Sequence, residues 1–188
     1  HYDHLGLGDQ FSLAPSLAGT IHPGADDNAS GTAGVLELAH MFAQETKHKR
    51  GVGFLTFAGE ELGRLGSAYY AEHPELPLSK AVAMINMDMI GRIRDDKVYI
   101  GGAGTGTTFE TILKSAATRH PFHTDFSEQG GYGASDHTSF TAKQVPVLFF
   151  FSGLHSDYHK PSDTWDKIDA PQAVKLLTFI GDVIDQLE

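Results

Sequence analysis

The chain has 188 residues, 40% hydrophobic and 20% charged, which fits one globular domain with enough interior for a core and excludes wholesale disorder. Its 14 basic and 24 acidic residues give a net charge of −10, which argues against a protein that binds nucleic-acid phosphates. There are no cysteines, so disulfides and cysteine-based zinc sites are excluded, and no apolar run approaches the ~20 residues of a membrane-spanning helix.

Along the chain, apolar residues at helical spacing alternate with short apolar runs typical of buried strands. Residues 1–24 are rich in glycine, proline and serine and predict a long loop. The predicted helices are residues 31–50, 60–73, 107–120 and 170–187, and the predicted strands are residues 51–58, 81–89, 97–100 and 145–151. This alternation predicts an α/β fold, with a mostly parallel or mixed central sheet flanked by helices on both faces, in a single domain over residues 1–188.

Five clusters of carboxylates and histidines stand at the ends of these predicted elements. Ligands of open α/β sheets gather outside the carboxyl ends of the strands, so such clusters are candidates for one shared site. They are residues 1–4 (HYDH), 24–31 (GADDNASG), 60–61 (EE), Asp88 within Met87-Asp88-Met89, and 155–159 (HSDYH).

Each cluster also has an ordinary structural explanation. Asp26, Asp27, Glu60 and Glu61 could be acids in the first turn of a helix, and His159 alone could lie in a surface loop. An acid between two buried apolar residues, such as Asp88, is harder to explain, because carboxylates are seldom buried without a cation. Five clusters of metal-compatible type together favour a metal site.

A pair of metal ions needs one bridging carboxylate and roughly two further ligands for each ion. His1, Asp26, Glu61, Asp88 and His159 supply that number with imidazole and carboxylate groups, which suits zinc with open positions for water. The remaining acid is Glu60, next to a ligand in sequence. A free carboxylate near a metal-bound water is the arrangement required of a general base.

Six segments occur in an order that is specific when they are taken together. They are residues 1–3 (HYD), 24–31 (GADDNASG), 57–67 (FAGEELGRLGS), 86–91 (NMDMIG), 135–137 (SDH) and 158–164 (YHKPSDT). On these segments the chain resembles the dizinc aminopeptidases, the co-catalytic zinc exopeptidases of peptidase family M28, a group that also includes glutaminyl cyclases and glutamate carboxypeptidases.

The resemblance implies a role for each matching metal ligand. Asp26 would bridge two Zn²⁺ ions, Glu61 and His159 would complete one site, and His1 and Asp88 would complete the other. The implied activity is that of a metallo-aminopeptidase, which hydrolyses the N-terminal peptide bond of peptide substrates.

The resemblance also implies roles for residues around the ions. Glu60 would be the general base and acid, Asp3 would orient the imidazole of His1, and Tyr158 and Tyr132 would donate to the developing oxyanion. The peptide bond between Asp26 and Asp27 would be the rare cis bond of this family.

Relatives of this kind carry further strands and a helix before the first histidine, and here nothing precedes His1. The resemblance therefore implies that the N-terminal part of the family fold is missing, and that the site needs a preceding segment or a second chain. It further implies a secreted or periplasmic location. The negative charge and the lack of a long apolar run predict neither nucleic acid nor membrane as a partner.

Two other functions stay open. A glutaminyl cyclase, an acyltransferase with a single zinc, would use Asp26, Glu61 and His159, but the presence of His1 and Asp88 counts against it. A catalytically inactive peptidase-like module would bind without hydrolysis. Such modules typically lose ligands, whereas every type of ligand is present here.

Overall fold

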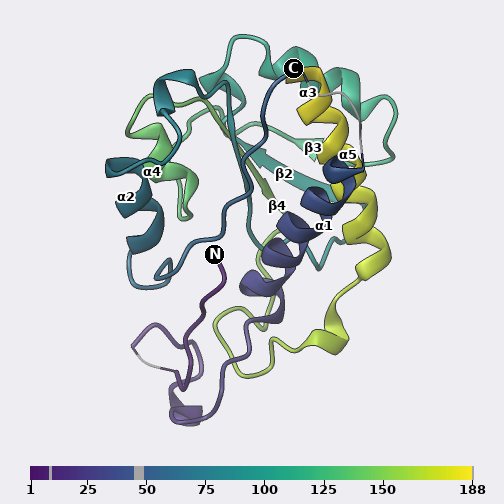
Figure 1. The fold of residues 1–188 in the computed structure, drawn as a ribbon. Coiled ribbons are helices and arrows are strands. Elements are labelled where there is room, and N and C mark those ends of the chain that lie inside the picture. Colours follow the sequence, from purple (N-terminus) through teal and green to yellow (C-terminus); the bar gives the residue numbers. More distant parts are fainter. Residues whose placement is uncertain (9, 45–48, 188) are drawn as a thin grey trace.

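The computed structural model describes residues 1–8, 10–44 and 49–187, and its centre is a mixed four-stranded sheet (Figure 1). The strands lie in the order β1-β4-β2-β3. β1 pairs with β4 in parallel, β2 pairs with β3 in parallel, and β2 pairs with β4 antiparallel. The strands are β1 (Met84–Met87), β2 (Lys97–Gly101), β3 (His123–Asp125) and β4 (Val147–Phe151).

Helices cover both faces of this sheet, as the sequence predicts. α1 and α3 both pack against α5 on one face, while α2 and α4 pack together on the other (Figure 1). The helices are α1 (Gly31–Ala43), α2 (Leu65–Glu72), α3 (Phe109–Ala117), α4 (His137–Thr141) and α5 (Ala170–Leu187). Shorter helical turns are η1 (Pro15–Leu17), η2 (Ala25–Ser30), η3 (Leu78–Lys80), η4 (Ala103–Thr105) and η5 (Trp165–Lys167).

The main hydrophobic core lies between the sheet and the helices α1, α3 and α5 that cover one of its faces. β4 is apolar throughout, and Leu148 and Phe150 are fully buried, as expected of a strand covered on both faces. The ring of Phe150 meets that of Phe179 from α5 edge to face, with centroids 6.0 Å apart. No helix among the described residues has the length and apolar character needed to cross a membrane.

Several predicted boundaries differ from the structure. The helix predicted over residues 31–50 ends at Ala43, and its residues 45–48 lie outside the described part of the chain. The helix predicted over 60–73 begins only at Leu65, because Glu60 starts a tight turn whose carbonyl accepts from Gly63 and Arg64. β3 and α4 have three and five residues, too short for a periodic pattern.

The strand predicted over residues 51–58 is wrong as a paired strand. These residues are extended, but they form no ladder with any strand of the described chain. β1 runs on the far side of an intervening groove.

Candidate metal centre

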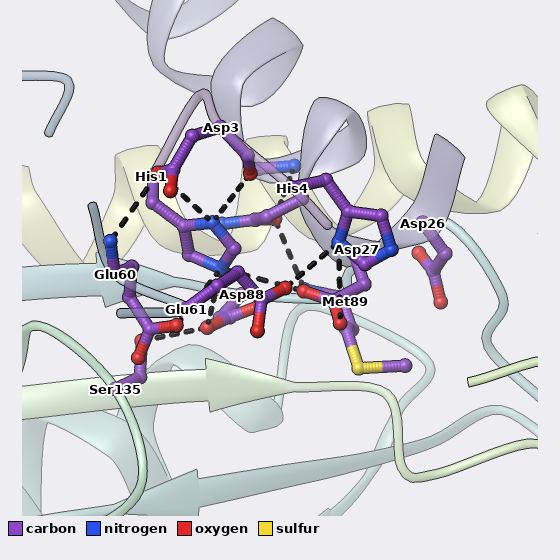
Figure 2. A network of polar contacts seen from close by, with 12 residues as sticks. His1, Asp3, His4, Asp26, Asp27, Glu60, Glu61, Asp88, Met89 and Ser135 are labelled. Atoms are coloured by element: carbon purple, nitrogen blue, oxygen red, sulfur yellow. Dashed lines mark hydrogen bonds and ion pairs between the residues drawn. The ribbon is translucent and has the colours of Figure 1, made fainter. Parts of the chain in front are cut away.

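Histidines and carboxylates from five separate segments meet at the carboxyl end of β1 (Figure 2). Asp88 directly follows β1, and Asp27 lies in η2, just before α1. The other members come from loops. The N-terminal loop carries two histidines, the turn after residues 51–58 carries two glutamates, and the loop after β4 carries one histidine. The cluster, called the acid–histidine cluster below, consists of His1, His4, Asp27, Glu60, Glu61, Asp88 and His159.

Asp27 lies at the centre of the cluster, between two sets of side chains. Its Oδ1 is 3.3 Å from Nε2 of His1, and the same Nε2 is 3.3 Å from Oδ2 of Asp88. Its Oδ2 is 3.3 Å from Nε2 of His159, which is 3.1 Å from Oε2 of Glu61. The two oxygens of one carboxylate therefore face two neighbouring groups of ligands, which is the geometry of a bridging ligand.

The two histidines that face Asp27 are held in the same way. Nδ1 of His1 donates to the carbonyl of Asp3 at 3.0 Å, and Nδ1 of His159 donates to the carbonyl of Phe11 at 2.9 Å. A backbone carbonyl can only accept, so each neutral imidazole carries its proton on Nδ1 and turns the lone pair of Nε2 toward the acids. This is the usual arrangement of histidines that bind metal.

Without a metal, the acids hold both imidazoles in the charged form. Burial acts to lower the pKa of His1, but hydrogen bonds to Asp27 and Asp88 outweigh it and raise that pKa to about 12. Asp27 and Glu61 raise the pKa of His159 to about 10 in the same manner.

Glu60 differs from the acid next to it. Its Oε2 lies 3.7 Å from Nε2 of His1, and burial raises its pKa to about 8, with the charges of Asp88 and Glu61 adding to the effect. The pKa of Glu61 is instead lowered by hydrogen bonds to His159 and His4, which outweigh its burial. The pKa values of two adjacent glutamates are thus shifted in opposite directions. Such a pair is typical of sites where one carboxyl group transfers protons and the other stays ionised.

Residues behind the cluster position its two aspartates. Oδ2 of Asp163 accepts the backbone amides of Asp26 and Asp27 at 3.0 and 3.1 Å, which fixes the loop that carries Asp27. Ser135 donates to Oδ2 of Asp88 at 2.6 Å and receives a hydrogen bond from Nδ2 of Asn86. Ser135 and Asp163 both belong to segments that the sequence analysis singled out without giving them a role.

The structure corrects the prediction for Asp26. This residue is fully buried and turned away from the cluster (Figure 2), where Oδ1 accepts the amide of Gly91 at 2.7 Å and Oδ2 lies 3.1 Å from Nε2 of His155. Asp27 takes the central position instead. The predicted cis bond is likewise displaced by one residue, because it joins Asp27 to Asn28.

Of the three other predicted site residues, Asp3 and Tyr158 contact members of the cluster, whereas Tyr132 does not in the described chain. Asp3 holds His1 through its carbonyl, while its carboxylate accepts the amide of Glu60 at 3.3 Å. The ring of Tyr158 stacks on His159, with centroids 3.9 Å apart. Tyr132 is 66% exposed, and the structure shows no contact between it and the cluster among the described residues.

His4 is, besides Asp27, the member of the cluster to which the sequence analysis gave no role in the site. Its Nδ1 lies 2.7 Å from Oε1 of Glu61 and 3.9 Å from Oδ2 of Asp27. The signal was its place in the opening HYDH segment, but a second histidine three residues from the first is uninformative without the fold.

Three buried atoms of the cluster have no hydrogen-bond partner in the described chain, namely Oδ2 of Asp27, Nε2 of His159 and Nε2 of His4. Buried polar atoms without partners are rare, because each loses its contact with water. Two of them, Oδ2 of Asp27 and Nε2 of His159, lie 3.3 Å apart as an ion pair. They stand among carboxylates and imidazoles, the donors that zinc prefers, so the residues present fit a metal.

Comparison with known proteins finds relatives among aminopeptidases. The model of peptidase family M28 matches residues 1–183. A protein named probable leucine aminopeptidase from Arthroderma otae is 30% identical over 157 residues, which cover 78% of this chain and 43% of that protein. The chain spans less than half the length of the curated relatives it matches.

Solved structures show the same fold. The aminopeptidase from Aneurinibacillus sp. strain AM-1 superposes with a TM-score of 0.77 at 28% identity, over 95% of this chain and 41% of that one. The glutaminyl cyclase of Porphyromonas gingivalis, at 20% identity, gives 0.78 over 99% of this chain and 70% of that one, and so shares the fold. Because the family model matches nearly the whole length of this chain, the chain belongs to peptidase family M28.

Proposed function

We propose that this chain forms the catalytic domain of a metal-dependent aminopeptidase, which uses two zinc ions to hydrolyse the N-terminal peptide bond of peptides. The observation that carries the proposal is the position of Asp27. Its two carboxylate oxygens face two separate sets of ligands, each with one imidazole and one further carboxylate. A single metal ion would leave one of these sets, and its buried charges, without a partner.

The residues divide between the ions accordingly. His1 and Asp88 would hold one ion, Glu61 and His159 would hold the other, and Asp27 would bridge them, with His4 beside Glu61. Bound zinc would supply a Lewis acid for the scissile carbonyl and lower the pKa of water toward ~7.

Glu60 is the residue that we assign to proton transfer. It follows the ligand Glu61 but keeps its own carboxylate beside His1, and burial raises its pKa to about 8. A carboxylate whose pKa is close to neutral can both accept a proton from the attacking water and return it to the leaving amine as the C–N bond breaks.

The free amino terminus of the substrate would bind at the same site. Asp27, Glu60, Glu61 and Asp88 are all at least partly buried around one point, and with the zinc ions in place they would offer hydrogen-bond acceptors to an α-amine rather than a net negative charge. Tyr158, held against His159 by ring stacking, is the group that we assign to the oxyanion.

The glutaminyl cyclase alternative shares the fold but would need only one ion. The pair formed by His1 and Asp88 would then have no function, although both residues are buried and offer ligand atoms within 4.8 Å of one on Asp27. In a binding module without catalysis, the raised pKa of Glu60 would have no function.

One experiment separates the three functions. The purified chain is stripped of metal, loaded with zinc, and assayed for zinc content, for hydrolysis of leucine p-nitroanilide and for cyclisation of an N-terminal glutaminyl peptide. We expect two zinc ions per chain and release of p-nitroaniline. One ion with release of ammonia from the glutaminyl peptide would support the cyclase, and bound zinc with neither product would support the binding module.

Glu60→Gln is the matched control for this experiment. The amide has the size of the carboxylate but cannot accept a proton, so zinc content should stay at two ions while turnover falls by roughly 10²- to 10⁴-fold. Turnover at the wild-type rate by the zinc-loaded variant would refute the assignment of Glu60.

A further inference from the structure

The loop between the opening HYDH segment and η2 folds around one buried histidine, His22. Its side chain is buried, whereas the other described residues of this loop, 6–8 and 10–21, are exposed or half-buried. Nδ1 of His22 donates to the carbonyl of Thr20 at 2.8 Å. In the neutral ring Nε2 then carries the lone pair, and it accepts the hydroxyl proton of Ser12 at 2.8 Å. Both nitrogens of the ring are therefore used to hold parts of one loop together.

The backbone around His22 packs closely on its ring. The amide of His22 donates to the carbonyl of Gly6 at 2.7 Å, which closes the base of the loop. Gly8 has a φ of +74°, and a Cβ at this position would lie 2.2 Å from Cε1 of His22. Only glycine fits there, because any side chain would meet the ring and would also disfavour the backbone conformation. The imidazole is thus fixed by contacts on its faces as well as by its hydrogen bonds.

The same loop holds His159, the residue that we assign to one zinc ion. Nδ1 of His159 donates to the carbonyl of Phe11, and the carbonyl of His159 accepts the amide of Leu13, both at 2.9 Å. In Figure 1 this loop and the loop that follows β4 lie side by side. Ser12 stands between the two residues that contact His159, and its hydroxyl reaches back to His22.

His159 needs support from outside its own segment. Its φ is +55°, in the left-handed region that is uncommon for residues with a side chain. Such a conformation persists only where the surrounding structure holds it. The carbonyl of Phe11 also sets the ring, because it accepts the proton of Nδ1 and leaves Nε2 to face Asp27 and Glu61. The direction of this one carbonyl therefore decides how His159 is presented to a metal.

We propose that His22 is a positioning residue for the metal site, which acts through the hydroxyl of Ser12 and the carbonyl of Phe11 on the imidazole of His159. The carbonyl of Phe11 and the nitrogen of Ser12 belong to one planar peptide group, so fixing Ser12 also fixes the direction of that carbonyl. The inference rests on the proposed function in one respect, namely that His159 binds metal.

Two substitutions at position 22 separate the contact with Ser12 from the contact with Thr20. The amide group of glutamine stands as many bonds from Cβ as Nε2 does, so His22→Gln should keep a partner for Ser12. The amide group of asparagine stands where Nδ1 does, so His22→Asn should keep only the contact with Thr20. We expect His22→Asn to behave like His22→Ala, and His22→Gln to behave like the wild type.

The first readout is the Nδ1 proton of His159, observed by NMR in the metal-free protein and assigned by its loss in His159→Gln. This proton is hydrogen-bonded to the carbonyl of Phe11, which slows its exchange with water. We expect its exchange to become about 10-fold faster in His22→Ala and in His22→Asn, and to stay at the wild-type rate in His22→Gln.

The second readout is zinc affinity, measured for each ion by competition with a chelator. In His22→Ala we expect about 10-fold weaker binding of the ion that His159 shares with Glu61. The ion held by His1 and Asp88 should bind as in the wild type. Thr105→Val is the control for a general loss of stability, because its hydrogen bonds go to Gly102 and Val147, and it should change neither readout.

Ser12→Ala tests the same route with the buried ring left in place, in case His22→Ala does not fold. It should speed exchange of the His159 proton as His22→Asn does. Unchanged exchange in Ser12→Ala, or equal exchange in His22→Asn and His22→Gln, would overturn the proposal. A chain that bound no zinc would refute the proposed function instead, while the exchange data from the metal-free protein would still decide the role of His22.

Discussion

The side-chain amide of Asn28 binds the peptide groups on both sides of Asp88. Its Nδ2 donates to the carbonyl of Met87 at 3.0 Å, and its Oδ1 accepts the amide of Met89 at 3.1 Å. Because Asn28 directly follows Asp27, one buried side chain ties Asp27 to Asp88, which lies sixty-one residues further along the chain. The spacing of the two carboxylates therefore depends on a residue that would not touch the metal itself.

Replacing Asn28 with alanine should loosen this spacing. Loss of such supporting hydrogen bonds typically weakens metal binding by about 10- to 100-fold, and we expect that loss of zinc affinity in a competition titration against a chelator. The control is Thr105→Val, which removes hydrogen bonds to Val147 and Gly102 far from the cluster. The control should lower stability without changing zinc affinity, and wild-type affinity in Asn28→Ala would contradict the prediction.

Asp26 and Asp27 form a matched pair for a second prediction. Asp27→Asn should abolish the binding of two zinc ions, because an amide cannot bridge two cations with two anionic oxygens. Asp26→Asn should keep both ions, since the side chain of Asp26 is hydrogen-bonded to Gly91 and His155 and, in the described chain, to no member of the cluster. Zinc content after dialysis gives the answer, with circular dichroism to show that both variants are folded. If Asp26→Asn lost an ion instead, the central position of Asp27 would be wrong.

The sequence could locate this aspartate pair but could not choose between its members. Neighbouring residues in an irregular loop have no periodicity that tells which side chain faces the site. The choice is made by Asp163, which binds both backbone amides, and by Gly91, which binds the side chain of Asp26. These partners are 137 and 65 residues away from Asp26, so only the folded chain brings them together.

The sequence predicted the fold correctly where a pattern of apolar residues extends over many positions. Four helices (α1, α2, α3 and α5) and three strands (β1, β2 and β4) could be located from the apolar pattern, and Asp88 could be singled out as an acid among apolar neighbours. Residues 51–58 show the limit of this reasoning. Their composition favours a strand, and they are extended, but a strand also needs a neighbour to pair with on at least one edge, which composition does not reveal.

The two tyrosines allow a third prediction with its own control. Tyr158→Phe keeps the ring that stacks on His159 but removes the hydroxyl, so turnover of leucine p-nitroanilide should fall by roughly 10²-fold with little change in KM. Tyr132→Phe removes an exposed hydroxyl without a contact to the cluster and should leave turnover within about twofold of wild type. A loss in Tyr132→Phe equal to that in Tyr158→Phe would mean that its loop closes over the substrate.

Removal of the metal should make stability depend steeply on pH. In the metal-free protein, burial raises the pKa of Glu60 to about 8, and the acids of the cluster raise those of His159 and His1 to about 10 and 12. A raised pKa means that the folded state binds more protons than the unfolded state, so stability falls as pH rises from the unfolded pKa to the folded one. For these three groups that range includes pH 6.5 to 8.

We therefore expect the urea midpoint of the metal-free protein to fall between pH 6.5 and 9. The lowered pKa values of Asp27 and Glu61 do not oppose this trend, because those acids are ionised in both states throughout the range. Glu60→Gln removes one of the contributing groups and should flatten the metal-free profile. Zinc competes with protons for the same ligands, so the gain in stability on adding zinc should be larger at pH 9 than at pH 6.5. A metal-free midpoint that rises with pH would mean that the imidazoles and Glu60 are not held together as the structure places them.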